Sequence, residues 1–196
     1  MRKIFRRVFV PIMLPVRALP ALIFMTILTA LPTSILAVPP ASAPSGGTDE
    51  RKIVVLDDFE NLDGWSVITS PGTRLEIARD VGHAGRGMRL DFEFQDGAGW
   101  AIARKEFHLR LPDNFAFHFQ LRGEAPAGDI EFKLVGPKQN VWWFKQRDFA
   151  FPSEWRPITV KKRHLGFAWG PGGPLEELAV IEFAILPGAQ GHGKGS

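Results

Sequence analysis

Residues 115–122 read Phe-Ala-Phe-His-Phe-Gln-Leu-Arg, with a large apolar side chain at every second position. Successive side chains of a β-strand point to opposite faces, so this period of two gives one strand an apolar face and a polar face. The same alternation recurs at residues 88–94, 130–134, 158–161 and 181–185. Each of these runs therefore predicts a strand that is half-buried against a core.

Turn-forming residues separate these runs and set the fold class. Clusters rich in Gly, Pro, Asp and Ser lie at residues 70–72, 82–87, 96–97, 111–113, 125–128 and 170–174. Only residues 174–179 have a helical pattern, and this stretch is too short to form a helical layer. About nine short strands without a βαβ rhythm predict an all-β fold, a two-sheet antiparallel β-sandwich of jelly-roll type.

The charge balance differs between the two ends of the chain. The 196 residues include 24 Lys+Arg and 21 Asp+Glu, but five of the basic residues and none of the acidic ones lie in residues 1–43. The remainder has 19 basic and 21 acidic residues, a formal net charge of −2, so we expect no nucleic-acid partner. The absence of cysteine excludes disulfides, a thiol nucleophile and cysteine-bound metals.

The N-terminal segment has the pattern of a signal peptide. A basic region, Arg2–Arg17, precedes the apolar run Ala21–Leu31, and Ala41–Ala43 has the small-x-small pattern of a cleavage site. A cut after Ser45 is an alternative because Pro44 follows the first site directly, and a retained membrane anchor is the other interpretation. We expect a secreted or periplasmic protein without membrane attachment after cleavage. The predicted segments are 1–43 signal peptide, 44–50 linker, 51–187 β-sandwich and 188–196 Gly-rich tail.

Catalytic patterns are weak in this sequence. Its five His residues show no metal-binding spacing, and no Gly-x-Ser-x-Gly motif occurs. The glycine-rich residues 82–87 lie between two predicted strands and indicate a hairpin turn, since a phosphate loop would open a helix. A β-sandwich hydrolase needs two carboxylates about 5–10 Å apart in one groove; Asp129 and Glu131 share a strand face, but such pairs usually lie on a solvated surface. We therefore expect a protein that is not an enzyme.

The tryptophans point to a binding surface instead. Trp142 and Trp143 are adjacent, so on a strand they must face opposite sides. Trp143 shares its side with Lys145 and Arg147, and an indole beside polar donors suits a sugar ring. The predicted carbohydrate-binding residues are Trp143, Trp169, Lys145, Arg147 and His164. The alternative is that both indoles of the pair are half-buried packing residues.

Several blocks of sequence carry a resemblance to a known family. Val55–Glu60 with Gly64-Trp65, and then Gly85–Phe92, resemble the opening motifs of galactose-binding-like carbohydrate-binding modules. The blocks Asn140–Arg147, Phe151–Trp155 and Lys161–Gly170 are similar to the N-terminal module of large secreted bacterial proteins that carry discoidin-type and glycosidase-like domains.

The resemblance implies a non-catalytic module that binds an oligo- or polysaccharide within a larger secreted protein. Two alternatives stay open, namely a packing or protein-interaction sandwich inside a larger glycoside hydrolase, and a β-sandwich hydrolase.

The resemblance also implies two features near the chain ends. Such modules continue into a closing strand beside the first strand, whereas residues 191–196 read Gly-His-Gly-Lys-Gly-Ser. We therefore expect a fragment of a longer protein, with downstream domains and an unpaired edge near residues 53–56. Many of these sandwiches also hold a structural calcium ion, and Asp58 and Glu60 could supply half of its oxygen ligands. No other cofactor is expected.

Overall fold

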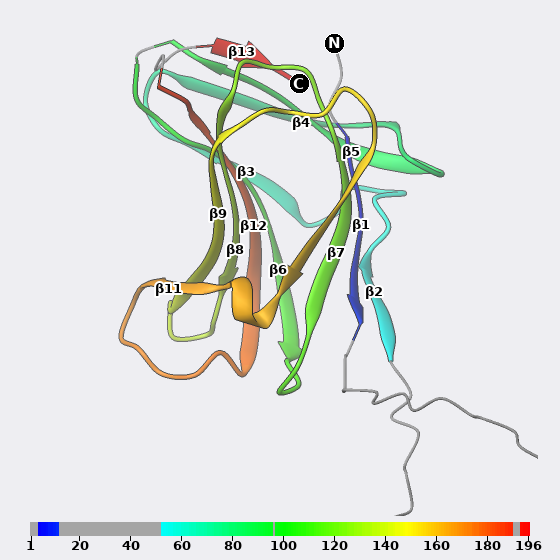
Figure 1. Ribbon diagram of the computed structural model, residues 1–196, viewed down its shortest axis with the longest axis vertical. Coiled ribbons are helices and arrows are strands. Elements are labelled where there is room, and N and C mark those ends of the chain that lie inside the picture. The colour runs from blue at the N-terminus through cyan, green and yellow to red at the C-terminus, as the bar shows by residue number, and fades with distance from the viewer. Residues whose placement is uncertain (1–3, 12–51, 96, 190–192) are drawn as a thin grey trace, which may run out of the picture. The chain divides into compact units, whose positions relative to one another are not determined.

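The computed structural model describes residues 4–11, 52–95, 97–189 and 193–196, and these form two antiparallel sheets packed face to face (Figure 1). The seven-stranded sheet has the order β10-β7-β1-β5-β13, with β2 paired to β1 and β4 paired to β5. The six-stranded sheet has the order β11-β9-β8-β12-β6-β3. The predicted antiparallel β-sandwich is confirmed.

The elements have the following bounds. The first sheet contains β1 (Ile4–Pro11), β2 (Ile53–Asp57), β4 (Thr73–Val81), β5 (Arg86–Phe94), β7 (Ala116–Arg122), β10 (Arg156–Lys161) and β13 (Gly193–Gly195). The second contains β3 (Trp65–Thr69), β6 (Ala101–Arg110), β8 (Gly128–Val135), β9 (Val141–Phe149), β11 (Gly166–Trp169) and β12 (Glu177–Pro187). One 3₁₀ turn, η1 (Lys162–His164), follows β10.

The core lies between the sheets and is built mainly from phenylalanine. The apolar positions of the alternating runs all point inward, and Phe132 of β8 lies at the centre of this group. Its ring centroid is 5.2 Å from that of Phe117 and 5.3 Å from that of Phe183. Aromatic pairs at these separations add to the stabilisation from burial alone. The period of two that predicted the strands therefore also determines which side chains fill the core.

The opening motif, residues 55–60 with Trp65, has a structural role. The buried carboxylate of Asp57 accepts hydrogen bonds from the Phe59 backbone N–H (2.8 Å), Trp65 Nε1 (2.9 Å) and Lys105 Nζ (2.8 Å). These bonds tie the end of β2 to β3 and β6. A buried carboxylate is costly unless it is paired, and here three donors satisfy it.

Two local sequence patterns, at residues 82–87 and 174–179, differ in what they become in the structure. The glycine-rich residues 82–87 form the hairpin turn between β4 and β5, with the Gly82 N–H donating to the Gly85 carbonyl at 2.8 Å. The helical pattern at residues 174–179 does not produce a helix, because residues 177–179 belong to β12. That strand pairs with β6 on one side and β8 on the other, and this pairing outweighs a weak local preference for helix.

Both ends of the chain contribute strands to the seven-stranded sheet. Ile4–Pro11, within the predicted signal peptide, pairs with β2, β5 and β7, and Gly193–Gly195, within the predicted tail, pairs with β5. Residues 12–51, which include the predicted cleavage site, lie outside the described residues. Within the described ranges, no helix is long and apolar enough to cross a membrane. Cleavage and export stay predictions.

Candidate functional site

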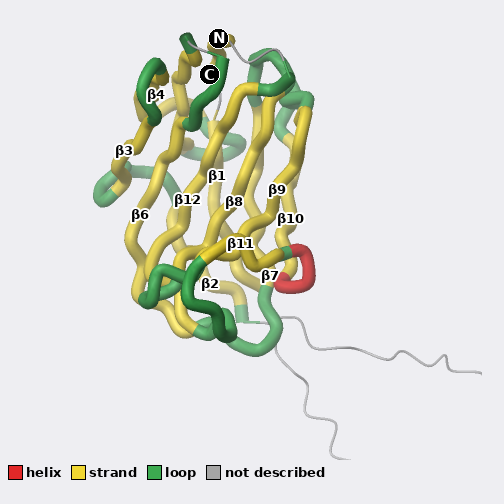
Figure 2. Tube along the Cα trace, turned by 90° about the vertical axis from the view of Figure 1, so that its left-hand side faces the viewer, coloured by secondary structure: helices red, strands yellow, loops and turns green. Residues whose placement is uncertain are grey.

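The candidate site is the face of the six-stranded sheet that points away from the core, which we call the outer face; Figure 2 views this sheet with β11 in front of it. Directly paired residues of antiparallel strands point to the same side of a sheet, so the strand register gives the side-chain rows on this face. The middle row contains Trp143, Lys133, Glu182, Arg104 and Ser66 on five consecutive strands. Beyond the indole, three charged side chains alternate in sign across the sheet.

Two further rows flank this one. On one side lie Lys145, Glu131, Ala184, Ile102 and Ile68. On the other side lie Trp169, Val141, Val135, Val180 and Glu106, and the three valines of this row form a small apolar cluster of their own. The outer face is therefore apolar along the row that contains the three valines. The other two rows carry the ion pairs.

Glu131 is the hub of the ion pairs. Its Oε1 lies 2.9 Å from Lys145 Nζ, and its Oε2 lies 3.0 Å from Lys133 Nζ. Lys145 Nζ also lies 3.2 Å from Asp129 Oδ2. The next pair across the sheet is looser, with 3.8 Å between Arg104 Nε and Glu182 Oε1. The network fixes the directions of these long side chains before any ligand arrives.

These charges are buried although they face away from the core. Glu131 is 4% exposed, Lys133 7% and Glu182 8%. Burial by itself would lower the pKa of Lys145, but the hydrogen bonds and negative charges of Glu131 and Asp129 outweigh burial and raise this pKa. The lysine is therefore held as a cation among buried carboxylates.

Trp143 and Trp169 form an aromatic corner beside the ion pairs. Their ring centroids are 5.6 Å apart and the planes meet at 88°. Lys145 Nζ lies 5.4 Å from the Trp143 ring, and Lys133 Nζ lies 5.5 Å from the Trp169 ring. Ammonium groups at these distances attract the π face of an indole. Trp169 is 48% exposed and is the more open of the two rings.

The loop after Trp169 is fixed by one buried side chain. Asn140 donates from Nδ2 to the Gly172 carbonyl (2.7 Å) and accepts from the Gly172 N–H at Oδ1 (2.8 Å). Gly170 has φ +125°, and a Cβ there would lie 2.6 Å from Asn140 Oδ1. This close approach holds the chain directly after Trp169 and limits where the indole can lie.

The structure brings together three of the five predicted binding residues, Trp143, Trp169 and Lys145. Arg147 is exposed near the end of β9, where the register with β8 is irregular. His164 ends η1, and its ring lies 6.3 Å from that of Phe144, whose side chain packs against the core. His164 therefore lies on the opposite side of β9 from Trp143, because adjacent strand residues face opposite ways.

Sequence reasoning missed the other charged residues of the outer face. Lys133, Glu182 and Arg104 lie on three different strands, and only the register places them in one row. Asp129 and Glu131 were noticed but were interpreted as a solvated pair. One sequence feature indicates such a charged face. Charged residues recur at the polar positions of strands whose other positions are all apolar.

The expected calcium ligands have local roles. Asp58 Oδ1 accepts the Glu60 N–H at 3.0 Å, and Glu60 Oε1 accepts the Arg86 N–H at 3.1 Å. In the part of the chain that the structure describes, no three His, Asp or Glu side chains come together as metal ligands. Calcium takes six to eight oxygen ligands, so these two carboxylates do not complete a site, and a role in calcium binding stays a prediction.

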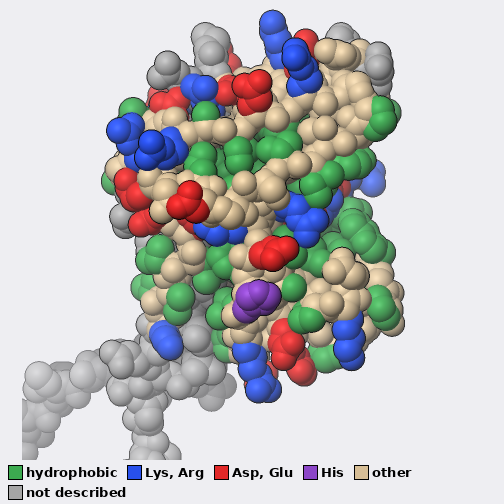
Figure 3. Space-filling view, turned by 180° about the vertical axis from the view of Figure 1, so that it is seen from behind, with side chains coloured by type: hydrophobic (Ala, Val, Ile, Leu, Met, Phe, Trp, Pro, Cys, Tyr) green, Lys and Arg blue, Asp and Glu red, His purple; other side chains and the backbone are tan. Residues whose placement is uncertain are grey.

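A depression of about 690 Å³ lies on the other sheet. Its lining includes Arg74, Glu76, Asp91, Glu93 and Lys194 from β4, β5 and β13. The side chains that line it are mainly charged, and no tryptophan is among them. Figure 3, which views the molecule from behind relative to Figure 1, also shows Lys and Arg interspersed with Asp and Glu on the side that it displays.

Solved structures with the same fold are carbohydrate-binding modules. One is a family 11 module from Clostridium thermocellum in complex with a β-1,3-1,4-mixed-linked tetrasaccharide, with a TM-score of 0.52, 18% identity and coverage of 71% of this chain and 88% of that one. Another is the family 11 module of a cellulosomal cellulase of C. thermocellum, with a TM-score of 0.52, 19% identity and coverage of 71% and 87%.

The similarity of this chain to the two modules concerns the fold alone, because the sequence identity is only 18% and 19%. No protein-family model and no curated protein matches the chain. The two structures therefore show the fold that this chain shares with family 11 modules.

Proposed function

We propose that the protein is an exported, non-catalytic carbohydrate-binding module whose ligand lies on the outer face of the six-stranded sheet. The observation that carries the proposal is the buried ion-pair network beside the half-exposed indole of Trp169. Flat aromatic rings stack on sugar C–H faces, and fixed charged groups accept and donate hydrogen bonds to hydroxyls. The fold shared with family 11 modules supports the same function.

In this proposal the two tryptophans have different roles. Trp169 offers the more open ring for stacking, while Trp143 supports it from the side. Lys133, Lys145 and Glu182 supply polar atoms along the sheet next to the stacked ring. The larger protein expected around this module, with its downstream domains, belongs to the proposal as well.

The alternatives fit the outer face less well. A packing module would present a mainly apolar surface, whereas the outer face carries the ion pairs of Glu131 and Glu182. A hydrolase needs a carboxyl group that is free to face the bond to be broken, whereas both oxygens of Glu131 are engaged by lysines. We therefore favour binding over catalysis for this face.

The first prediction tests the aromatic corner. The full-length chain is titrated calorimetrically with the mixed-linkage β-1,3-1,4 tetrasaccharide, and a glycan array extends the search to other sugars. We expect Trp169→Ala and Trp143→Ala to weaken binding about 5- to 150-fold, by analogy with stacking losses of about 1–3 kcal/mol elsewhere. Phe167→Ala is the matched control, because Phe167 is a half-exposed aromatic residue of β11 that contacts Trp142 instead.

The control should leave affinity unchanged. Full affinity in both tryptophan variants, with native circular dichroism, would refute the assignment of the site. If Arg74→Ala alone abolished binding, the ligand would lie in the depression on the other sheet.

A further inference from the structure

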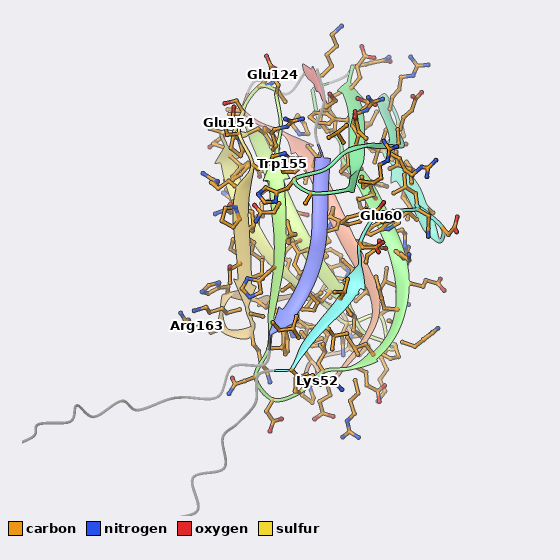
Figure 4. The ribbon with its side chains drawn as sticks, turned by 90° about the vertical axis from the view of Figure 1, so that its right-hand side faces the viewer. Lys52, Glu60, Glu124, Glu154, Trp155 and Arg163 are labelled. Atoms are coloured by element: carbon orange, nitrogen blue, oxygen red, sulfur yellow. The ribbon has the colours of Figure 1, made fainter. Side chains whose placement is uncertain are left out.

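Strand β1 lies in the interior of the seven-stranded sheet, as Figure 4 shows with β7 on one side and β2 on the other. Ile4 and Phe5 pair with β5 on one edge and with β7 on the other. Further along, Val8–Pro11 pair with all but one residue of β2. One short segment thus holds together three strands that are far apart in the sequence.

Without β1, the remaining pairings divide this sheet. β7 is paired on its other edge with β10, and β5 is paired on its other edge with β4. On the edge that faces β1, β13 covers only Phe92–Phe94 of β5. Among the described strands, β2 pairs with β1 alone. The sheet would separate into β7–β10 and β4–β5–β13, and β2 would lose its strand partner.

The space between β5 and β7 is one strand wide. Neighbouring strands lie about 4.8 Å apart, so strands on both sides of β1 are separated by roughly 10 Å. Met88 and Leu90 of β5 and Phe117 and Leu121 of β7 are fully buried at this position. An empty gap would leave two rows of backbone N–H and C=O groups unpaired directly above these apolar side chains, which is unfavourable.

We propose that this gap is a strand-acceptor site and that the chain's own segment Ile4–Pro11 is its occupant. In the full-length chain the segment completes the sheet by main-chain pairing with both edges. Loss of the segment would open a groove that accepts an extended peptide in the same way, as in β-strand addition to sheets. Since the segment lies in the predicted signal peptide, processing of the chain would control access to the groove.

The test uses the full-length chain, produced without export, with a protease site placed in residues 44–50. After cleavage, the N-terminal fragment is separated under mild denaturant, and amide hydrogen exchange is measured in β2 and β7. We expect exchange there to be at least about tenfold faster than in the intact chain. Added peptide of residues 4–11 should restore the protection, and the same peptide with N-methylated amides should not.

Each outcome of this test decides the proposal. Equal protection in the intact chain and in the cleaved, separated chain would overturn it. Aggregation of the cleaved chain supports it if the unmodified peptide prevents the aggregation and the methylated peptide does not, and overturns it if neither peptide has an effect.

A second variant tests the strand without cleavage. In an interior strand every N–H points to one neighbour or the other, so Phe5→Pro removes a donor to β5 or β7 whichever way it points. We expect at least about tenfold faster exchange in β2 and β7, with the exchange of β8 and β12 in the other sheet unchanged. Ala21→Pro, outside the strand, is the control; equal exchange in Phe5→Pro and Ala21→Pro would overturn the proposal.

Discussion

Burial of the charged residues on the outer face is unfavourable for the free energy of folding. Moving an ion pair out of water costs several kcal/mol per ion, and apolar residues of similar size are often equally stabilising. Glu131 and Lys133 alternate along β8 with core residues, so valine or isoleucine at these positions would suit the strand equally well. The strand therefore does not need these buried charges for its stability, which supports the proposed role in ligand binding.

A different polar group, the half-buried His118 on β7, is expected to make stability depend on pH. Its Nδ1 lies 2.9 Å from Thr159 Oγ1, and its Nε2 is buried with no hydrogen-bond partner among the described residues. Burial, with a smaller contribution from the Lys161 charge, lowers the pKa of His118 from its ordinary value of 6.5. Neutral imidazole is thus the form that the folded protein favours.

The second prediction follows from this shift. As pH falls below 6.5, the unfolded chain binds a proton at His118 before the folded chain does, so the free energy of unfolding decreases until the lower folded-state pKa is reached. Above pH 6.5 this residue contributes no pH dependence. We expect His118→Asn to lose less stability than the wild type between pH 7 and pH 5, as measured by urea denaturation. Parallel pH profiles would contradict the prediction.

At the scale of elements, β9, β11 and the loop after β11 behave as one unit. β11 pairs only with β9 among the described strands, and Asn140, just before β9, holds the loop after Trp169. The position of the exposed indole therefore depends on a hydrogen-bonded loop rather than on the sheet interior. Under the proposed function, a loop fixed in this way would present Trp169 to the ligand at little cost in ordering.

The third prediction concerns this loop. Asn140→Asp conserves the size of the side chain but replaces the donor that faces the Gly172 carbonyl with an oxygen atom. We expect the variant to lose about 1–3 kcal/mol of unfolding free energy, because two hydrogen-bond acceptors then face each other and one of them is on a buried side chain. Binding of the tetrasaccharide should weaken as well, because the position of Trp169 is no longer fixed.

Lys138→Ala is the control for this change, because Lys138 is exposed in the same turn. Urea denaturation and calorimetric titration of the two variants provide the comparison. Wild-type stability in Asn140→Asp would show that the loop does not depend on this pair of hydrogen bonds.

At the scale of the whole molecule, stability depends on both sheets having all of their interior strands in place. Domains have a net stability of about 5–15 kcal/mol, so one interior strand accounts for a large fraction of it. Open strand edges also recruit other chains and favour aggregation. In this sandwich the interior strand β1 comes from the N-terminal segment.

The fourth prediction compares the full-length chain with a chain that begins at Gly46. We expect the shorter chain to unfold at a markedly lower temperature and to form aggregates, because it lacks β1. Thermal unfolding and light scattering at equal protein concentration provide the measurement. Equal midpoints and monomeric behaviour in both chains would show that residues 46–196 close the sheet by themselves.

The sequence by itself determined the strands with alternating apolar residues, the core and the sandwich, because a period of two in apolar residues directly encodes a half-buried strand. It also determined that Trp142 and Trp143 face opposite sides, since this follows from strand geometry alone. Arg147 and His164 could not be placed in this way, because a strand irregularity and a turn separate them from the regular alternation.

The tertiary structure alone decided which residues share the outer face and which segment closes the other sheet. Lys133, Glu182 and Arg104 are 49 and 78 residues apart along the chain, and only the register of three strands makes them neighbours. The pairing of Ile4–Pro11 with β5 and β7 is likewise non-local. Alternation gives each side chain a face, whereas register and strand order depend on the packing of the whole core.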